Sequence, residues 1–308
     1  MTRPFRFGIF ATRAESAAEW RAKARRIEEL GYDVLLMPDH LGTQLAPVPA
    51  LMAAADATTT LRLGSFVFAN DYRNPVMLAK EAATIDLLSG GRLEFGLGAG
   101  WSTPDYETLG IAYDPPKVRV ARMAEALRLI KRCWVEDRVE HSGPHYTLRA
   151  ARVLPKPLQR PHPPVMVGGG GPVMLRLAAR EADIVALAPQ VDQEGKPLMA
   201  HVTLGATDEK VRLVREAAGT RFDTLELNVI VFDAAVTDEP ASIVDAVAGR
   251  MKAAAAALVE SPYFLFGSVA TLRRQLLERR ERFGITYYSI PEKVMEPFAA
   301  LARELRGP

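Results

Sequence analysis

The chain has 308 residues, of which 48% are hydrophobic and 25% charged, and its formal net charge is +2. These values are typical of a globular protein, and the small net charge gives no indication of a polybasic surface. We therefore expect neither a nucleic-acid partner nor a membrane partner. The longest apolar runs are shorter than a bilayer span, and the start MTRPFRFGIF has no signal-peptide core. The single cysteine, Cys133, excludes an intramolecular disulfide and a cysteine metal cluster. We therefore expect a cytoplasmic protein with no metal site.

Short apolar runs alternate with helical patterns along the first hundred residues. Strand starts recur near positions 5, 33, 62 and 92. Helix starts are marked between them, by the capping box of Ser16 and Glu19 and by the pair Asn74-Pro75. This regular alternation indicates βαβ units and a parallel sheet.

An irregular, proline-rich insertion at about residues 137–164 interrupts the alternation, and it could include a small hairpin. The alternation then resumes. Further strands are predicted at 165–167, 184–187, 225–232 and 286–290, and helices at 209–218, 241–258, 269–282 and 295–305. Eight strands with helices between them predict one α/β domain over residues 1–308, a (β/α)₈ TIM barrel with an insertion before the fifth strand. A doubly wound sheet is the competing architecture, but neither glycine cluster has the dinucleotide-binding spacing.

Four successive glycines, Gly168, Gly169, Gly170 and Gly171, follow the fifth predicted strand, and Pro172 opens a helix after them. Free backbone N–H groups beside a helix N-terminus suit a phosphate group. A tight connection without any ligand would give the same pattern. The stretch therefore predicts a phosphate-binding turn, with that plain connection as the alternative.

In a TIM barrel the residues that follow the strands form the active site. This chain has no serine elbow, no carboxylate pair and no zinc-binding histidine pattern at those positions. His141, His145 and His162 are interpreted as loop histidines. The positions after the strands hold glycine, aromatic residues and one histidine, His40, which together suggest a flat cofactor with an anionic tail.

The chain resembles the bacterial luciferase-like monooxygenase superfamily, and within it the branch that uses the deazaflavin coenzyme F420. The motifs that carry the resemblance are spread over most of the chain. They are Pro38-Asp39-His40, Arg73-Asn74-Pro75, the block SGGR at 89–92, the block GLGAGW at 96–101, Pro155-Lys156-Pro157 and Phe266-Gly267-Ser268.

The resemblance implies an isoalloxazine-like ring at the C-terminal mouth of the barrel. A bulge, often with a non-prolyl cis peptide, would end the third strand near Ser65 and support the ring. His40 would be the catalytic group, because an imidazole exchanges protons near neutral pH, and Asp39 would orient the histidine or its loop. Arg73 would be a counter-charge near the cofactor tail. The residues implied to bind the cofactor are Phe66, Val67, Asn70, Gly98, Ala99, Gly100 and Trp101, together with the four glycines at 168–171.

Three functions fit these residues. The first is an F420-dependent oxidoreductase that moves a hydride between the deazaflavin and a small-molecule substrate. The second is a two-component monooxygenase that uses FMN. The third is a non-catalytic protein that binds a flavin or deazaflavin. The resemblance also implies a homodimer, with the second and third helices in its interface.

Overall fold

The computed structural model describes residues 3–192 and 195–307, and the chain divides into two compact units. Unit 1 comprises Met1–Ala11, Arg26–Leu36 and Gly168–Pro308, and unit 2 comprises Thr12–Arg25 and Met37–Val167. Each unit is therefore built from segments that are far apart in the sequence. The single domain over 1–308 stays a prediction.

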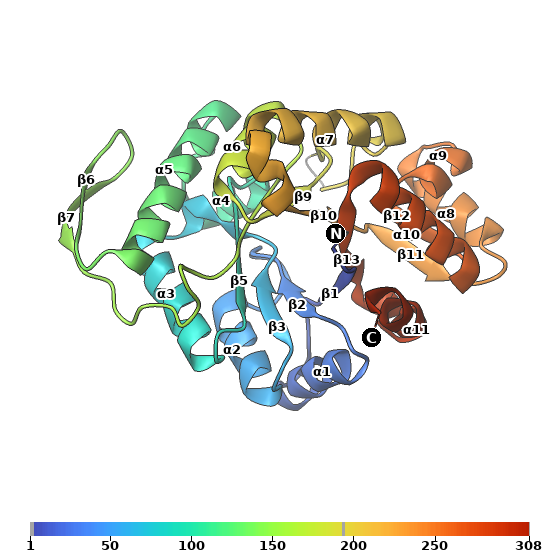
Figure 1. Ribbon diagram of the computed structural model, residues 1–308, viewed down its shortest axis with the longest axis horizontal. Helices are drawn as coiled ribbons and strands as arrows, with labels where there is room; N and C mark the ends of the chain where they lie inside the picture. The colour runs from blue at the N-terminus through green and yellow to red at the C-terminus, as the bar shows by residue number, and fades with distance from the viewer. Residues whose placement is uncertain (1–2, 193–194, 308) are drawn as a thin grey trace. The chain divides into compact units, whose positions relative to one another are not determined.

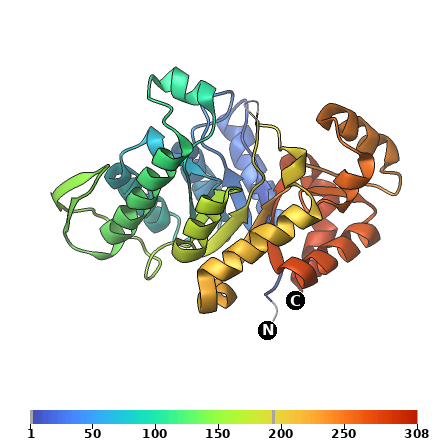
Figure 2. The ribbon, with the colours of Figure 1, turned by 90° about the horizontal axis from the view of Figure 1, so that it is seen from above.

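Unit 1 contains a parallel sheet with the strand order β2-β1-β13-β10-β9. Phe7 of β1 contacts Phe298 of α11 and Tyr288 of β13, with ring centroids 5.3 and 6.2 Å apart, so α11 packs on this sheet. Helices α6 and α7 lie side by side (Figure 2).

The strands of the unit 1 sheet are β1 (Arg6–Phe10), β2 (Val34–Met37), β9 (Ile184–Leu187), β10 (Glu226–Ile230) and β13 (Ile285–Pro291). The helices are α6 (Pro172–Glu181), α7 (Leu204–Ala218), α10 (Val269–Phe283) and α11 (Met295–Arg306), with 3₁₀ turns at Met199–His201, Gly219–Thr224 and Glu292–Val294. The remaining helix, α1 (Ala17–Glu29), begins in unit 2 and ends in unit 1.

Two predicted features of unit 1 are wrong in detail. The helix predicted at 241–258 is two helices, α8 (Ala241–Met251) and α9 (Ala255–Glu260), because Lys252 adopts a left-handed conformation that ends α8. The helix predicted to start near Glu209 begins at Leu204, because the Thr203 side chain caps it. The sequence also predicts a long loop at 190–204. This loop ends earlier, since α7 begins at Leu204 and a 3₁₀ turn covers Met199–His201, and residues 193–194 lie outside the described chain. Unit 1 also contains a two-stranded parallel sheet that the sequence did not predict, formed by β11 (Asp233–Val236) and β12 (Phe264–Gly267).

Unit 2 is organised around β5, which pairs in parallel with β3, β4 and β8. The predicted third strand is broken into β3 and β4, and the Phe66–Val67 peptide between them is cis. This is the position at which the family resemblance implied a non-prolyl cis bond. The strands are β3 (Arg62–Ser65), β4 (Phe68–Ala69), β5 (Leu93–Gly98) and β8 (Val165–Gly169), of which Val165–Val167 belongs to this unit. The helices are α2 (Pro47–Ala57), α3 (Pro75–Leu88), α4 (Thr103–Leu109) and α5 (Pro116–Val135), with a 3₁₀ turn at Asn70–Tyr72.

The insertion contains the small hairpin that the sequence suggested, formed by β6 (Val139–Ser142) and β7 (Thr147–Ala151), which pair antiparallel. The hairpin lies beside α5 (Figure 1). His141 is part of β6, so its interpretation as a loop residue is wrong. The segment after the hairpin is held by the buried Asp86, whose carboxylate accepts hydrogen bonds from the backbone N–H groups of Leu158 and Gln159.

Candidate functional site

His40 lies directly after β2 and is held by Asp105, a residue of α4. The His40 Nδ1 and Asp105 Oδ2 atoms are 2.6 Å apart. The same carboxylate accepts hydrogen bonds from the Tyr72 hydroxyl and from the Leu41 N–H. Burial opposes ionisation of Asp105, but hydrogen bonds from His40, Leu41 and Ser102 hold the pKa of Asp105 below its ordinary value. Asp105 is therefore an anion that only accepts hydrogen bonds, so the proton on the His40–Asp105 bond belongs to Nδ1.

The other ring nitrogen of His40, Nε2, takes no part in the bond to Asp105. In a neutral imidazole with a proton on Nδ1, Nε2 is a hydrogen-bond acceptor. The His40 side chain is 25% exposed, and its ring lies 5.1 Å from that of Trp101, edge to face. The arrangement gives an oriented base beside an exposed aromatic ring, which can take a proton from a hydroxyl group.

Asp39 does not contact His40. Its carboxylate accepts hydrogen bonds from the backbone N–H of Ala69, at 3.0 Å, and from both terminal nitrogens of Arg73. Asp39 thus joins the end of β2 to the end of β4. Arg73 is occupied by this pairing and by Glu81 at 3.7 Å, and does not stand free as a counter-charge.

Asn70 is buried at the end of β4, where its side-chain nitrogen donates to Asp71 at 3.0 Å and to the Tyr146 hydroxyl at 3.3 Å. Asp71 also accepts hydrogen bonds from Arg122 and from Tyr106. Burial would raise the pKa of Asp71, but these hydrogen bonds keep it below its ordinary value. Asn70, Asp71, Arg122 and Tyr146 line a surface hollow of unit 2.

The glycines at the end of β5 are explained by packing within unit 2. A Cβ atom on Gly98 would lie 2.5 Å from Cγ2 of Val67, and one on Gly100 would lie 2.2 Å from the Tyr106 hydroxyl. Gly100 also has a φ of +75°, which favours glycine. Ala99 is buried between them, and its carbonyl accepts a hydrogen bond from Tyr106. Phe66 and Val67 are half-buried, and Trp101 is 41% exposed.

The four successive glycines are placed differently from the prediction. Strand β8 continues to Gly169, so Gly168 and Gly169 are strand residues and the turn consists of Gly170 and Gly171. A Cβ atom on Gly170 would meet the Ala188 carbonyl oxygen at 2.3 Å, whereas one on Gly171 would meet nothing within 4 Å. Gly171 is the N-cap of α6, so the open backbone is at the start of that helix. These glycines begin unit 1, whereas His40, Asn70 and Trp101 belong to unit 2.

Sequence reasoning missed Asp105, Tyr72 and Tyr146. It assigned no helix at 103–109, although Ser102-x-x-Asp105 matches the start signal of a helix. Tyr72 and Tyr146 carry no sequence signal of their own. Burial, with Asp105 as the nearby charge, raises the pKa of Tyr72, so its hydroxyl stays protonated and donates to Asp105.

Within residues 3–192 and 195–307, none of the helices is both long and apolar enough to cross a membrane. No group of three or more histidine, cysteine, aspartate or glutamate side chains is arranged there to hold a metal ion.

The chain is similar to known proteins in sequence and in fold. A model of the luciferase-like monooxygenase family matches residues 3–220. An F420-dependent glucose-6-phosphate dehydrogenase from Amycolatopsis mediterranei is 32% identical over 168 residues, which cover 52% of this chain and 50% of that protein. The chain spans about half the length of the curated relatives it matches.

Two solved structures are similar over almost the whole chain. A monooxygenase from Streptomyces bottropensis is 22% identical with a TM-score of 0.76, and the match covers 96% of this chain and 98% of that one. The coenzyme F420-dependent tetrahydromethanopterin reductase from Methanopyrus kandleri is 18% identical with a TM-score of 0.76, and the match covers 96% and 97%. At these identities the likeness shows the fold, which is the predicted (β/α)₈ TIM barrel.

Proposed function

Since the chain belongs to the luciferase-like monooxygenase family, we propose that it is an F420-dependent oxidoreductase that transfers a hydride between the deazaflavin and a small organic substrate. The observation that carries this proposal is the His40–Asp105 pair at 2.6 Å beside the exposed ring of Trp101. The proposed site lies at the carboxyl ends of β2, β4 and β5, which is where TIM barrels carry their active sites.

The residues of unit 2 fit a deazaflavin. The bound cofactor would supply the hydride chemistry, and the protein would supply binding, orientation and a proton acceptor. His40 Nε2 accepts the hydroxyl proton of an alcohol substrate during oxidation, or returns it during reduction. Asp105 fixes the tautomer and stabilises the imidazolium that results. Phe66, Val67 and Asn70 would contact the ring at the break between β3 and β4.

The surroundings of His40 favour an uncharged, apolar substrate. Leu41 and Trp101, which we call the apolar rim, are exposed large side chains next to the pair: the Leu41 N–H donates to Asp105, and the Trp101 ring lies 5.1 Å from that of His40. The arginines of this region are engaged: Arg73 pairs with Asp39, and Arg122 with Asp71 and Asp114. The third, Arg119, is buried and donates to the backbone carbonyls of Ala99 and Gly100. Burial of an apolar group against the rim would stabilise such a substrate, whereas a phosphate dianion would meet cations that are already paired.

Titration with F420 and with FMN, side by side, tests the proposal. We expect a saturable fluorescence change with F420 at micromolar concentrations, and F420 reduction with small secondary alcohols in preference to glucose 6-phosphate. Oxygen uptake with reduced FMN, together with no response to F420, would instead support a two-component monooxygenase. Tight F420 binding with no turnover of any substrate would support a non-catalytic binding protein.

We also propose that the backbone N–H groups at Gly170 and Gly171 bind the cofactor's phosphate. The open space at Gly171 and the N-terminus of α6 support this assignment. Gly171→Ala fits the observed φ of −86° and serves as the control. Gly171→Asp places a negative charge at the same point, and we expect it to weaken F420 binding by tenfold or more. Equal affinity of the two variants for F420 would contradict the phosphate site.

We propose a homodimer as well. Helix α3 exposes Met77, Leu87 and Leu88, and Leu88 is 64% exposed. Exposed apolar side chains grouped on one helix are typical of an interface. Light scattering should give twice the chain mass for the wild type and a lower mass for Leu88→Lys, and a monomeric wild type would contradict the proposal.

A further inference from the structure

The insertion hairpin reaches the candidate site through Tyr146, a residue of the turn between β6 and β7. The Tyr146 hydroxyl accepts a hydrogen bond of 3.3 Å from the side-chain nitrogen of Asn70. The two residues are 76 positions apart in the sequence, and both line the surface hollow of unit 2. Burial raises the pKa of Tyr146, so the hydroxyl is neutral and can take this role over the whole working pH range.

The hydrogen bonds of Asn70 determine which of its atoms is left for a ligand. The Asp71 carboxylate only accepts hydrogen bonds, because Arg122 and Tyr106 keep it ionised. The Asn70 atom that faces Asp71 must therefore be the nitrogen, and its second hydrogen goes to Tyr146. The Asn70 carbonyl oxygen Oδ1 is left as an acceptor for a group that donates.

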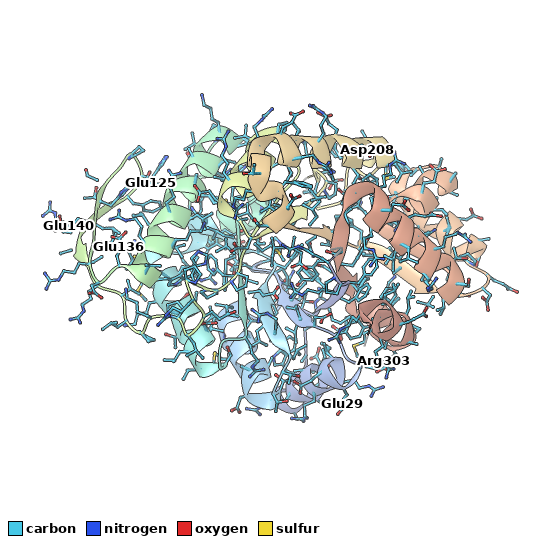
Figure 3. All side chains as sticks on the ribbon, in the orientation of Figure 1. Glu29, Glu125, Glu136, Glu140, Asp208 and Arg303 are labelled. Atoms are coloured by element: carbon cyan, nitrogen blue, oxygen red, sulfur yellow. The ribbon has the colours of Figure 1, made fainter. Side chains whose placement is uncertain are left out.

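The hairpin turn is itself held by one buried carboxylate. Glu125 of α5 is 4% exposed and accepts hydrogen bonds from His141 Nε2 at 2.8 Å and from the backbone N–H groups of His145 and Tyr146 at 3.2 and 3.0 Å. Figure 3 labels Glu125 on α5. Two of these bonds hold the backbone of the turn, including that of Tyr146, so Glu125 fixes the position from which Tyr146 meets Asn70.

We propose that the insertion hairpin positions Asn70 as a hydrogen-bond acceptor for the imide N–H of the bound deazaflavin ring. Tyr146 and Glu125 are positioning residues in this arrangement, and neither contacts the reacting atoms. The proposal deepens the F420-dependent function and rests on it. It also assigns a role to the insertion, which the barrel itself does not need.

A double-mutant cycle on F420 affinity tests the proposal. We expect Tyr146→Phe and Asn70→Ala each to raise the Kd for F420 by roughly threefold to tenfold, because each removes hydrogen bonds. The double variant should bind no more weakly than Asn70→Ala alone, since Tyr146 acts through Asn70. Tyr32→Phe is the matched control, because it removes a phenol hydroxyl that donates to the Met295 carbonyl in unit 1. An unchanged Kd for Tyr146→Phe, or additive effects in the double variant, would overturn the proposal.

A second measurement uses the protein without cofactor, so that it does not depend on the proposed function. The side-chain amide hydrogens of Asn70 should exchange slowly in the wild type and faster in Tyr146→Phe, as followed by nuclear magnetic resonance. Equal exchange in the two proteins would overturn the Tyr146–Asn70 contact. If the wild type shows this protection but does not bind F420, the proposed function has failed and the contact has not. Asn70→Ser replaces Asn70→Ala in the cycle if the alanine variant does not fold.

Discussion

Unit 2 contains two histidine–carboxylate pairs that are alike in geometry and differ in their surroundings. His40 lies 2.6 Å from Asp105, and His141 lies 2.8 Å from Glu125. Both histidine side chains are 25% exposed, and hydrogen bonding holds the pKa of each carboxyl below its ordinary value against the opposing effect of burial. A paired histidine and carboxylate therefore does not by itself identify a catalytic group.

The difference lies in what each carboxylate holds in addition to its histidine. Asp105 accepts from the Tyr72 hydroxyl and the Leu41 N–H, which belong to segments that follow β4 and β2. Glu125 accepts from two backbone N–H groups of one hairpin turn. Asp105 thus fixes the His40 side chain among the strand ends, beside the exposed Trp101. Glu125 instead fixes the backbone of the hairpin turn at His145 and Tyr146. This difference fits the proposed proton transfer by His40, whereas the surroundings of His141 fit a structural role.

Removing each histidine should separate the two roles most clearly. We expect His40→Ala to lower kcat for F420 reduction by about a hundredfold or more, because a positioned acid–base group contributes about 10² to 10⁴. F420 affinity should change little, since the imidazole acts on the substrate proton. In His141→Ala, kcat should stay within about threefold of wild type, because Glu125 keeps both backbone hydrogen bonds. Similar losses of kcat in the two variants would contradict the comparison.

Neutralising each carboxylate should give the next largest effects, and in different parameters. Asp105→Asn leaves the His40 tautomer unfixed and the imidazolium without its counter-charge, so we expect kcat to fall by about tenfold to a hundredfold. Glu125→Gln should instead raise the Kd for F420 by roughly threefold with kcat almost unchanged, because it loosens the turn that carries Tyr146. Stopped-flow kinetics and fluorescence titration measure the two parameters separately. If both variants changed only the Kd, the proton-transfer role of the His40 pair would be wrong.

The sequence predicted His40 because the motif Pro38-Asp39-His40 stands directly after a strand, a position that the fold turns toward the active site. The sequence could not predict which carboxylate is the hydrogen-bond partner of His40. Asp39 is adjacent to His40 in the sequence but bonds to Arg73 and Ala69, whereas Asp105 comes from a helix 65 residues further along the chain. Asp39 and His40 lie in the loop that follows β2, where no regular period fixes the direction of adjacent side chains. The long-range pairing depends on how the elements pack.

The same limit applies to the fold. The alternation of strands and helices predicted the TIM barrel, because the short apolar runs of the strands and the helical periods between them are visible in the sequence itself. Short elements such as α4, β11 and β12 were missed, because they are additions to the eight-strand alternation and carry no period of their own. The sequence predicted Gly98 and Gly100 as cofactor-binding residues, and that assignment stays a prediction. Their packing reasons, Val67 and the Tyr106 hydroxyl, became visible only in three dimensions.

Lowering the pH should have the smallest effect, and it should reduce the stability that each pair contributes in the same way. The reason is that both carboxyls have lowered pKa values in the folded protein. Each carboxylate therefore contributes stability that is complete above its ordinary pKa, 3.8 for Asp105 and 4.5 for Glu125, and that is lost as the pH falls through the lowered folded value. Asparagine or glutamine at these positions does not titrate. Asp105→Asn and Glu125→Gln should each reduce the slope of the unfolding free energy against pH below about pH 4, by up to about 1.4 kcal/mol per pH unit.

Urea unfolding at a series of acidic pH values measures this slope. The control is Glu107→Gln, which removes an exposed carboxylate of α4. A reduced slope in only one of the two variants would show that the pairs differ in their electrostatics as well as in their surroundings, and a wild-type slope in both would mean that neither pair is intact in the folded protein.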